Sequence, residues 1–173
     1  MKKFLAMLMA VMMVLSLVTV PVMAETPAAN DPRLSTAPKT GTAAAPADAA
    51  NLNEALNVAG GTLTFTSEGD HPWIVDGDAA KSTNVNVANS TSTVSTTVTA
   101  AAGDILQFDF MSFGEGAGDY VWDGLHLTVD GTEVMKWSRV ETWTTYAVEL
   151  TAGEHTVAWS YQKDGSVDRE GDY

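Results

Sequence analysis

The sequence of 173 residues contains no cysteine. This absence excludes a disulfide framework, a thiolate nucleophile, and zinc or iron–sulfur sites with cysteine ligands. Basic residues are scarce as well: 9 Lys and Arg stand against 22 Asp and Glu, which leaves a formal net charge of −13. Phosphate backbones and anionic lipid surfaces repel such a chain. We therefore expect no nucleic-acid partner and no binding to a bilayer surface.

Only one long apolar run occurs, at residues 4–20, and no second run of that length follows. Two lysines precede the run, and Ala24 ends an acceptable cleavage site, so we interpret residues 1–24 as a secretory signal peptide. The alternative is an uncleaved anchor, but the run is marginal for spanning a bilayer and Pro21 interrupts it. An exported chain without cysteine fits a bacterial protein, secreted or at the cell surface, with no membrane insertion after cleavage.

Large apolar side chains are nearly missing from residues 25–50, which consist mostly of Ala, Pro, Thr and Asp. Such a segment cannot bury enough surface to offset its ordering entropy, so we expect a disordered linker. Residues 51–173 hold all five Trp and are numerous enough for one domain with a core of its own.

The hydrophobic pattern in residues 51–173 has a period of two. In residues 105–113, for example, Leu106, Phe108 and Phe110 fall on one side of an extended chain. Similar alternation recurs in residues 62–66, 90–99, 125–129, 146–150 and 157–161, and Gly-containing turn pairs separate these runs. The pattern predicts an all-β fold: an antiparallel β-sandwich of jelly-roll type.

Several motifs resemble one known group of modules. They are Gly-Gly-Thr-Leu at 60–63, His-Pro-Trp at 71–73, the hairpin at 147–161, Lys-Asp-Gly-Ser-Val at 163–167 and Gly-Asp-Tyr at 171–173. Together they resemble a jelly-roll repeat module, MAM-like or concanavalin A-like, of surface proteins from gut Firmicutes. The resemblance implies a domain that binds glycans or proteins and supplies no catalytic residues.

In those modules the Gly-Asp-Tyr element leads into one more apolar strand. Here it ends the sequence at Tyr173. We therefore expect either a fragment of a longer protein or a domain that lacks a final strand and leaves one sheet edge open. An open edge is a place where another strand adds.

The Asp-Gly pair at residues 130–131 predicts a two-residue hairpin, with Leu127 opposite Val134 on an apolar face. The other face then carries aromatic and polar side chains, and a flat ring stacks well on the apolar face of a sugar. Trp143, in the next run, is expected on the same side. The expected ligand-binding residues are therefore Trp122, His126, Glu133, Trp137 and Trp143. The alternative is that this face is the other half of the core. A slip of one residue would also exchange the faces of the second strand.

Acidic residues gather in the predicted loops, where carboxylates and carbonyls bind calcium. The first choices as metal ligands are Asp119 with Asp123 and Asp164 with Asp168. None of them has the spacing of an EF-hand loop, and a solvated acidic surface is the alternative. Calcium is the only cofactor that the sequence suggests.

Catalytic signatures are lacking. There is no Gly-x-Ser-x-Gly elbow, the three His have no metal-ligand spacing, and no strand carries the paired carboxylates of a glycosidase. We expect a non-catalytic binding or adhesion module whose partner is a glycan or a host or cell-surface glycoprotein. The alternatives are a structural spacer repeat of a large surface protein and, less favoured, a concanavalin A-like glycoside hydrolase.

Overall fold

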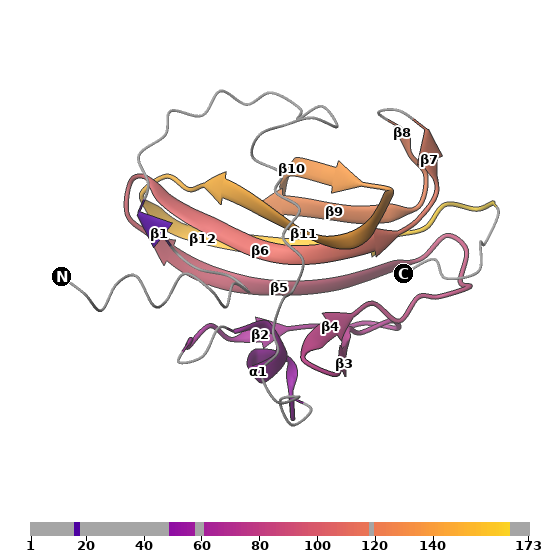
Figure 1. The fold of residues 1–173 in the computed structure, drawn as a ribbon, viewed down its shortest axis with the longest axis horizontal. Coiled ribbons are helices and arrows are strands. Elements are labelled where there is room, and N and C mark those ends of the chain that lie inside the picture. Colours follow the sequence, from indigo (N-terminus) through magenta and orange to yellow (C-terminus); the bar gives the residue numbers. More distant parts are fainter. Residues whose placement is uncertain (1–15, 18–48, 58–60, 118–119, 167–173) are drawn as a thin grey trace.

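The computed structural model describes residues 16–17, 49–57, 61–117 and 120–166. Almost every regular element in them is a β-strand, and all strand pairs are antiparallel (Figure 1). The all-β prediction is confirmed. The predicted signal peptide and linker lie outside the described residues, except for residues 16–17 and 49–50. No helix in the described part is long and apolar enough to cross a membrane.

Two main sheets form the domain. The larger has the order β10 (Thr132–Trp137), β9 (Gly124–Val129), β12 (Gly153–Gln162), β5 (Thr91–Ala100) and β2 (Phe65–Thr66). The smaller has the order β1 (Ser16–Leu17), β6 (Asp104–Phe113) and β11 (Arg139–Glu149). The hairpins β3–β4 (Ile74–Asp76, Ala79–Lys81) and β7–β8 (Gly116–Ala117, Tyr120–Val121) and the helix α1 (Leu52–Leu56) complete the described elements.

One hydrophobic core joins the two sheets. Along β6 the residues Leu106, Phe108 and Phe110 are buried while their neighbours are only half-buried, as the period-two pattern predicts. The Phe108 ring lies 5.8 Å from that of Tyr146 in β11 and 5.3 Å from that of Trp159 in the larger sheet. Aromatic contacts of this kind hold the sheets face to face.

The helix α1 is short, and hydrogen bonds at its ends stabilise it. Asn51 caps it by accepting the backbone N–H of Glu54, and the Glu54 carboxylate accepts the Ala50 N–H in return. Asn53 then accepts the backbone N–H of Phe65 at 2.7 Å, which ties α1 to β2. Figure 1 shows α1, β2 and the β3–β4 hairpin grouped on the side of β5 away from β9 and β10.

Candidate binding sites

The hairpin between β9 and β10 turns as predicted but loses the predicted register. Asp130 and Gly131 have positive φ values of 52° and 76°, as a type I′ turn requires. Thr132 pairs with Val129, but Met135, and not Val134, lies opposite Leu127. Val134 is thus the extra residue of a β-bulge. A bulge moves every later residue of its strand to the other face.

Because of this bulge, the predicted placement of Trp137 on the outer face is wrong. Trp137 pairs with Leu125 and is 8% exposed. Its ring centroid lies 4.3 Å from that of Phe110 and 5.0 Å from that of Tyr146. Trp137 therefore belongs to the core, where it cannot stack on a sugar.

His126 of β9 and Glu133, which precedes the bulge in β10, do meet, on the outer face of the larger sheet. The His126 Nδ1 lies 2.7 Å from the Glu133 Oε2, and Lys136 Nζ lies 3.3 Å from the other carboxylate oxygen. Partial burial raises the pKa of the Glu133 carboxyl, but the hydrogen bond and charge of His126, together with Lys136, outweigh it and lower the pKa overall. The pair is a polar contact without the predicted aromatic partners Trp137 and Trp143.

Trp143 lies in a different place. It is half-buried and lines a cavity of about 260 Å³ beside β6, together with Trp73. The five residues predicted to share one binding face are therefore spread over the core, the outer face of the larger sheet, this cavity and the β7–β8 end.

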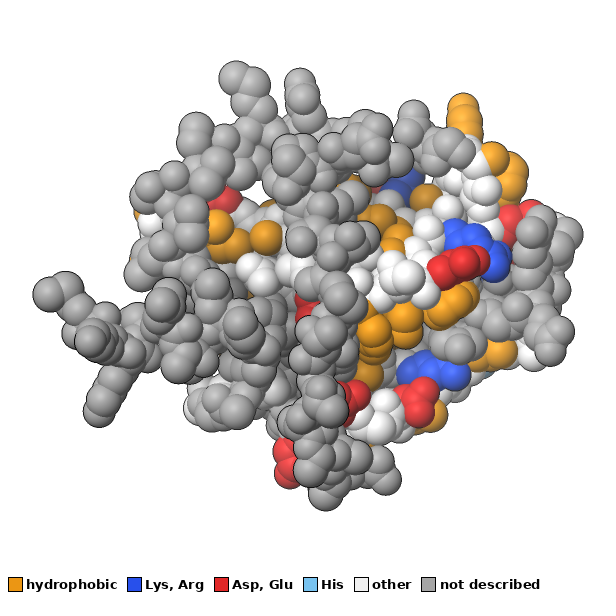
Figure 2. Space-filling model, in the orientation of Figure 1, with side chains coloured by type: hydrophobic (Ala, Val, Ile, Leu, Met, Phe, Trp, Pro, Cys, Tyr) orange, Lys and Arg blue, Asp and Glu red, His pale blue; other side chains and the backbone are white. Residues whose placement is uncertain are grey.

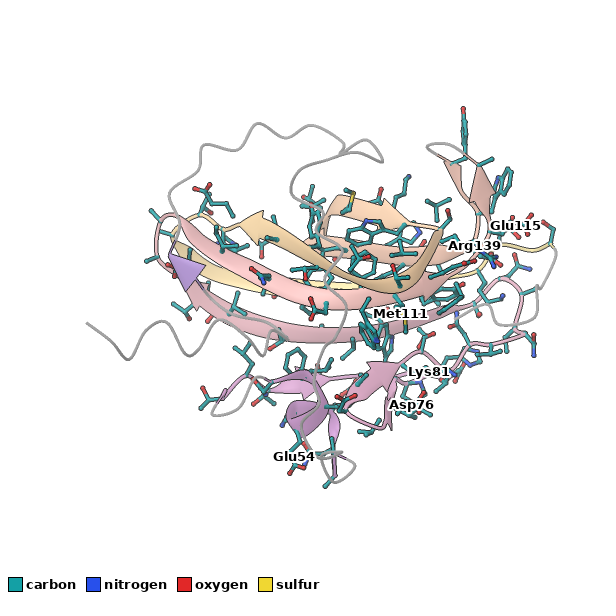
Figure 3. The ribbon with its side chains drawn as sticks, in the orientation of Figure 1. Glu54, Asp76, Lys81, Met111, Glu115 and Arg139 are labelled. Carbon is teal, nitrogen blue, oxygen red and sulfur yellow. The ribbon has the colours of Figure 1, made fainter. Side chains whose placement is uncertain are left out.

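Trp122 is the exposed member of the predicted set. It is 46% exposed, and Tyr120, two residues earlier, is 74% exposed. The Trp122 backbone N–H donates to the Glu115 carbonyl at 2.9 Å, which fixes the chain at the base of the β7–β8 hairpin. Beside them is a hollow of about 90 Å³ lined by Gly114, Glu115, Gly116, Trp122 and Arg139. Figure 3 shows Glu115 and Arg139 together at this end of the molecule.

Close backbone packing holds this end in place. A Cβ on Gly114 would lie 2.2 Å from the Asp123 carbonyl oxygen, and one on Gly116 would lie 2.4 Å from that of Tyr120. Glu115 and Asp123 also exchange two backbone hydrogen bonds of 3.0 Å, which join the two chain segments at the base of the hairpin. Glycine is therefore required at both positions, because a side chain would clash with the neighbouring backbone.

Asp123, a predicted calcium ligand, is paired with a lysine. Its Oδ2 lies 3.3 Å from Lys163 Nζ, and its Oδ1 accepts the Asp164 N–H at 2.7 Å; the Asp123 and Lys163 side chains are each 1% exposed. The Asp164 carboxylate accepts hydrogen bonds from Ser166. The other predicted ligands, Asp119 and Asp168, lie outside the described residues. No group of three or more His, Asp or Glu in the described part could hold a metal ion, and calcium stays a prediction.

A second histidine pair, not predicted, closes the β9–β10 turn onto β12. His155 Nδ1 lies 2.7 Å from the Asp130 carboxylate, and Nε2 lies 2.9 Å from the Thr151 carbonyl oxygen. Both partners are acceptors, so only the doubly protonated ring satisfies both. The hydrogen bond to Asp130, then that to Thr151, raises the pKa of His155, and the bonds from His155 and Thr156 lower the pKa of Asp130.

This pair predicts a stability that depends on pH. Because the pKa of His155 is raised in the folded state, its contribution is complete below the unfolded value of about 6.5 and is lost as the pH rises through the folded value. We expect the free energy of unfolding, measured by urea titration at a series of pH values, to fall above about pH 6.5. The variants His155→Gln and Asp130→Asn should both flatten this decline; an unchanged decline in either would assign it to other groups.

Comparisons with family models, with curated proteins and with solved structures find no match to this chain. What the chain binds is therefore inferred from the side chains that it exposes.

Proposed function

We propose that this domain is a non-catalytic binding module of an exported bacterial protein, and that it binds a carbohydrate, free or on a glycoprotein. The proposal includes a jelly-roll sandwich behind a secretory leader, in line with the resemblance to secreted surface modules. The observation that carries it is the exposure of Trp122 and Tyr120 at the β7–β8 hairpin.

These two exposed aromatic side chains are close together in the sequence. Tyr120 lies in β8, and Trp122 lies in the bend that follows this strand. Trp and Tyr each combine a large apolar ring with a polar group, and their flat rings suit the apolar face of a pyranose. Arg139 and Glu115 line the adjacent hollow and offer a donor and an acceptor for sugar hydroxyls.

A non-catalytic role agrees with the state of one nearby carboxylate, that of Asp123. A glycosidase needs two carboxyl groups that face each other across the sugar. Asp123 is 1% exposed and paired with Lys163, so it cannot reach a bound sugar. The spacer alternative expects all the Trp side chains to be buried, and the exposure of Trp122 does not fit it.

The variant Trp122→Ala tests the proposal. We expect the affinity for the bound glycan to fall at least about tenfold, because the loss of one stacked ring removes about 1.5 kcal/mol. Calorimetric titration of the full chain measures this effect, and the melting temperature should change little because the side chain is half-exposed. Ile74→Ala, which truncates another exposed apolar side chain at 50% exposure, is the matched control and should bind like the wild type. Equal affinity of the Trp122 variant and the wild type would exclude this site.

A further inference from the structure

The cavity of about 260 Å³ that Trp143 and Trp73 line runs along one edge of β6. Its lining includes Phe108 and Phe110 from the core face of β6, and Asp109 and Met111 from the opposite face. Side chains from both faces of one strand line the same space only if that space lies along the edge of the strand. The cavity is therefore a groove beside β6 that opens into the core between the two sheets.

Among the described residues, only a short part of this edge of β6 is paired. On its other side β6 pairs with β11 from Ile105 to Phe113. On the groove side β1 pairs only with Asp104 and Ile105, and within the described residues no strand pairs with residues 106–111 there. Alternate residues of such an edge present backbone N–H and C=O groups to whatever fills the groove.

The groove is large and mainly apolar. Its volume of about 260 Å³ exceeds the roughly 150 Å³ of an apolar cavity that admits benzene. Phe65 and Trp159 contribute to its floor, and the small side chains of Ala79 and Ala80 keep the wall on β4 open. An occupant that brings large apolar side chains would restore the packing that the groove interrupts.

Two polar groups at the groove lack partners. Trp73 Nε1 and the Ser82 hydroxyl are buried and have no hydrogen-bond partner in the described part of the protein, and both residues line the groove. An unsatisfied buried donor costs about 1–3 kcal/mol. Both atoms are closed to solvent, so these unpaired donors mark imperfect packing of this wall and not contacts for an occupant.

The rim of the groove is acidic. Among the described residues that line it, Asp76, Asp78 and Asp109 stand against one cation, Lys81, so the formal balance of these residues is negative. Figure 3 shows Met111 of β6 across from Lys81 and Asp76 of the β3–β4 hairpin, and Figure 2 shows hydrophobic side chains gathered in this region. An apolar floor under an acidic rim suits a ligand that is apolar on one side and basic on the other.

We infer that the β6 edge binds an extended segment of another protein, in which large apolar residues alternate with Lys or Arg. The segment adds as a strand beside residues 106–111. Its apolar side chains enter the groove next to Phe108 and Phe110, and its basic side chains lie on the outer face next to Asp109. Backbone pairing supplies the affinity, and the alternation supplies the specificity.

Synthetic peptides of about seven residues, added to the full chain, test this inference. The probe alternates valine with lysine; the controls are a scrambled sequence with the lysines together, a version with a central proline, and one that alternates valine with glutamate. We expect saturable binding of the probe by calorimetry and slower amide hydrogen exchange in residues 106–111. Each control should bind at least tenfold more weakly. The scrambled peptide lacks the alternation, the proline peptide lacks one backbone N–H of the strand pair, and the glutamate peptide lacks the positive charge.

Two variants locate the site. Ala80→Phe fills the groove from β4 and should weaken peptide binding at least tenfold, while the melting temperature shows that the variant is folded. Thr97→Phe, on an exposed position of β5 outside the groove, is the matched control and should bind like the wild type. Equal binding of the probe and the proline peptide would overturn strand addition. So would slow exchange without peptide at those amides of residues 106–111 that point away from β11, or a dimer through β6, because another segment of this chain or a second copy would then occupy the edge.

Discussion

The Trp137→Ala variant is expected to lose about 3–5 kcal/mol of the free energy of unfolding. Trp137 is 8% exposed, and its ring contacts Phe108, Phe110 and Tyr146 at centroid distances of 6.3, 4.3 and 5.0 Å. Truncation leaves a cavity between the two sheets where these aromatic rings pack. Urea unfolding followed by circular dichroism measures the loss.

Trp122→Ala is the matched control for this experiment, because it truncates the same type of side chain at a position that is 46% exposed. Its free energy of unfolding should stay within about 0.5 kcal/mol of the wild type. If the Trp137 variant is as stable as the wild type but no longer binds glycan, Trp137 lies on the outer face. That is the position predicted for a hairpin without a bulge.

Lys163→Met should be equally damaging, with an expected loss of about 3–5 kcal/mol. The substitution leaves the Asp123 carboxylate buried at 1% exposure without the ammonium group that lies 3.3 Å from it. The hydrogen bond from the Asp164 N–H remains, but one neutral donor does not replace a countercharge. The same urea titration measures the loss.

The double variant Asp123→Asn with Lys163→Met tests the cause. Because it removes both charges, it should be clearly more stable than Lys163→Met alone. Lys136→Met is the control for an exposed pair, since Lys136 and Glu133 are 38% and 43% exposed, and should cost only about 0–1 kcal/mol. A double variant no more stable than the single one would assign the loss to packing of the lysine stem and not to charge.

The strands could be predicted from the sequence wherever the two faces of a strand differ from each other in polarity. In β6 and β12 the alternation of large apolar and small or polar residues identifies the buried side chains, because successive side chains point to opposite faces. The turn at Asp130 could also be predicted from the sequence, because two successive positions with positive φ favour Asp-Gly.

The candidate site was predicted only in part. The bulge at Val134 has no sequence signature, and it alone moved Trp137 from the predicted face into the core. Trp122 precedes this hairpin, so the bulge does not affect its placement, and its side chain is exposed. The contact of Asp123 with Lys163 joins residues 40 positions apart, and no local pattern predicts such a pairing. In the sequence, Asp123 is simply one of several acids in a loop.

Tryptophan fluorescence of the full chain, titrated with a panel of polysaccharides and mucin glycans, tests the central claim most directly. The account predicts a saturable change with one class of sugar, and the loss of that change in Trp122→Ala but not in Ile74→Ala. No change across the panel, in protein that melts cooperatively, would contradict a carbohydrate-binding function. A change that survives in Trp122→Ala would place the ligand away from the β7–β8 hairpin.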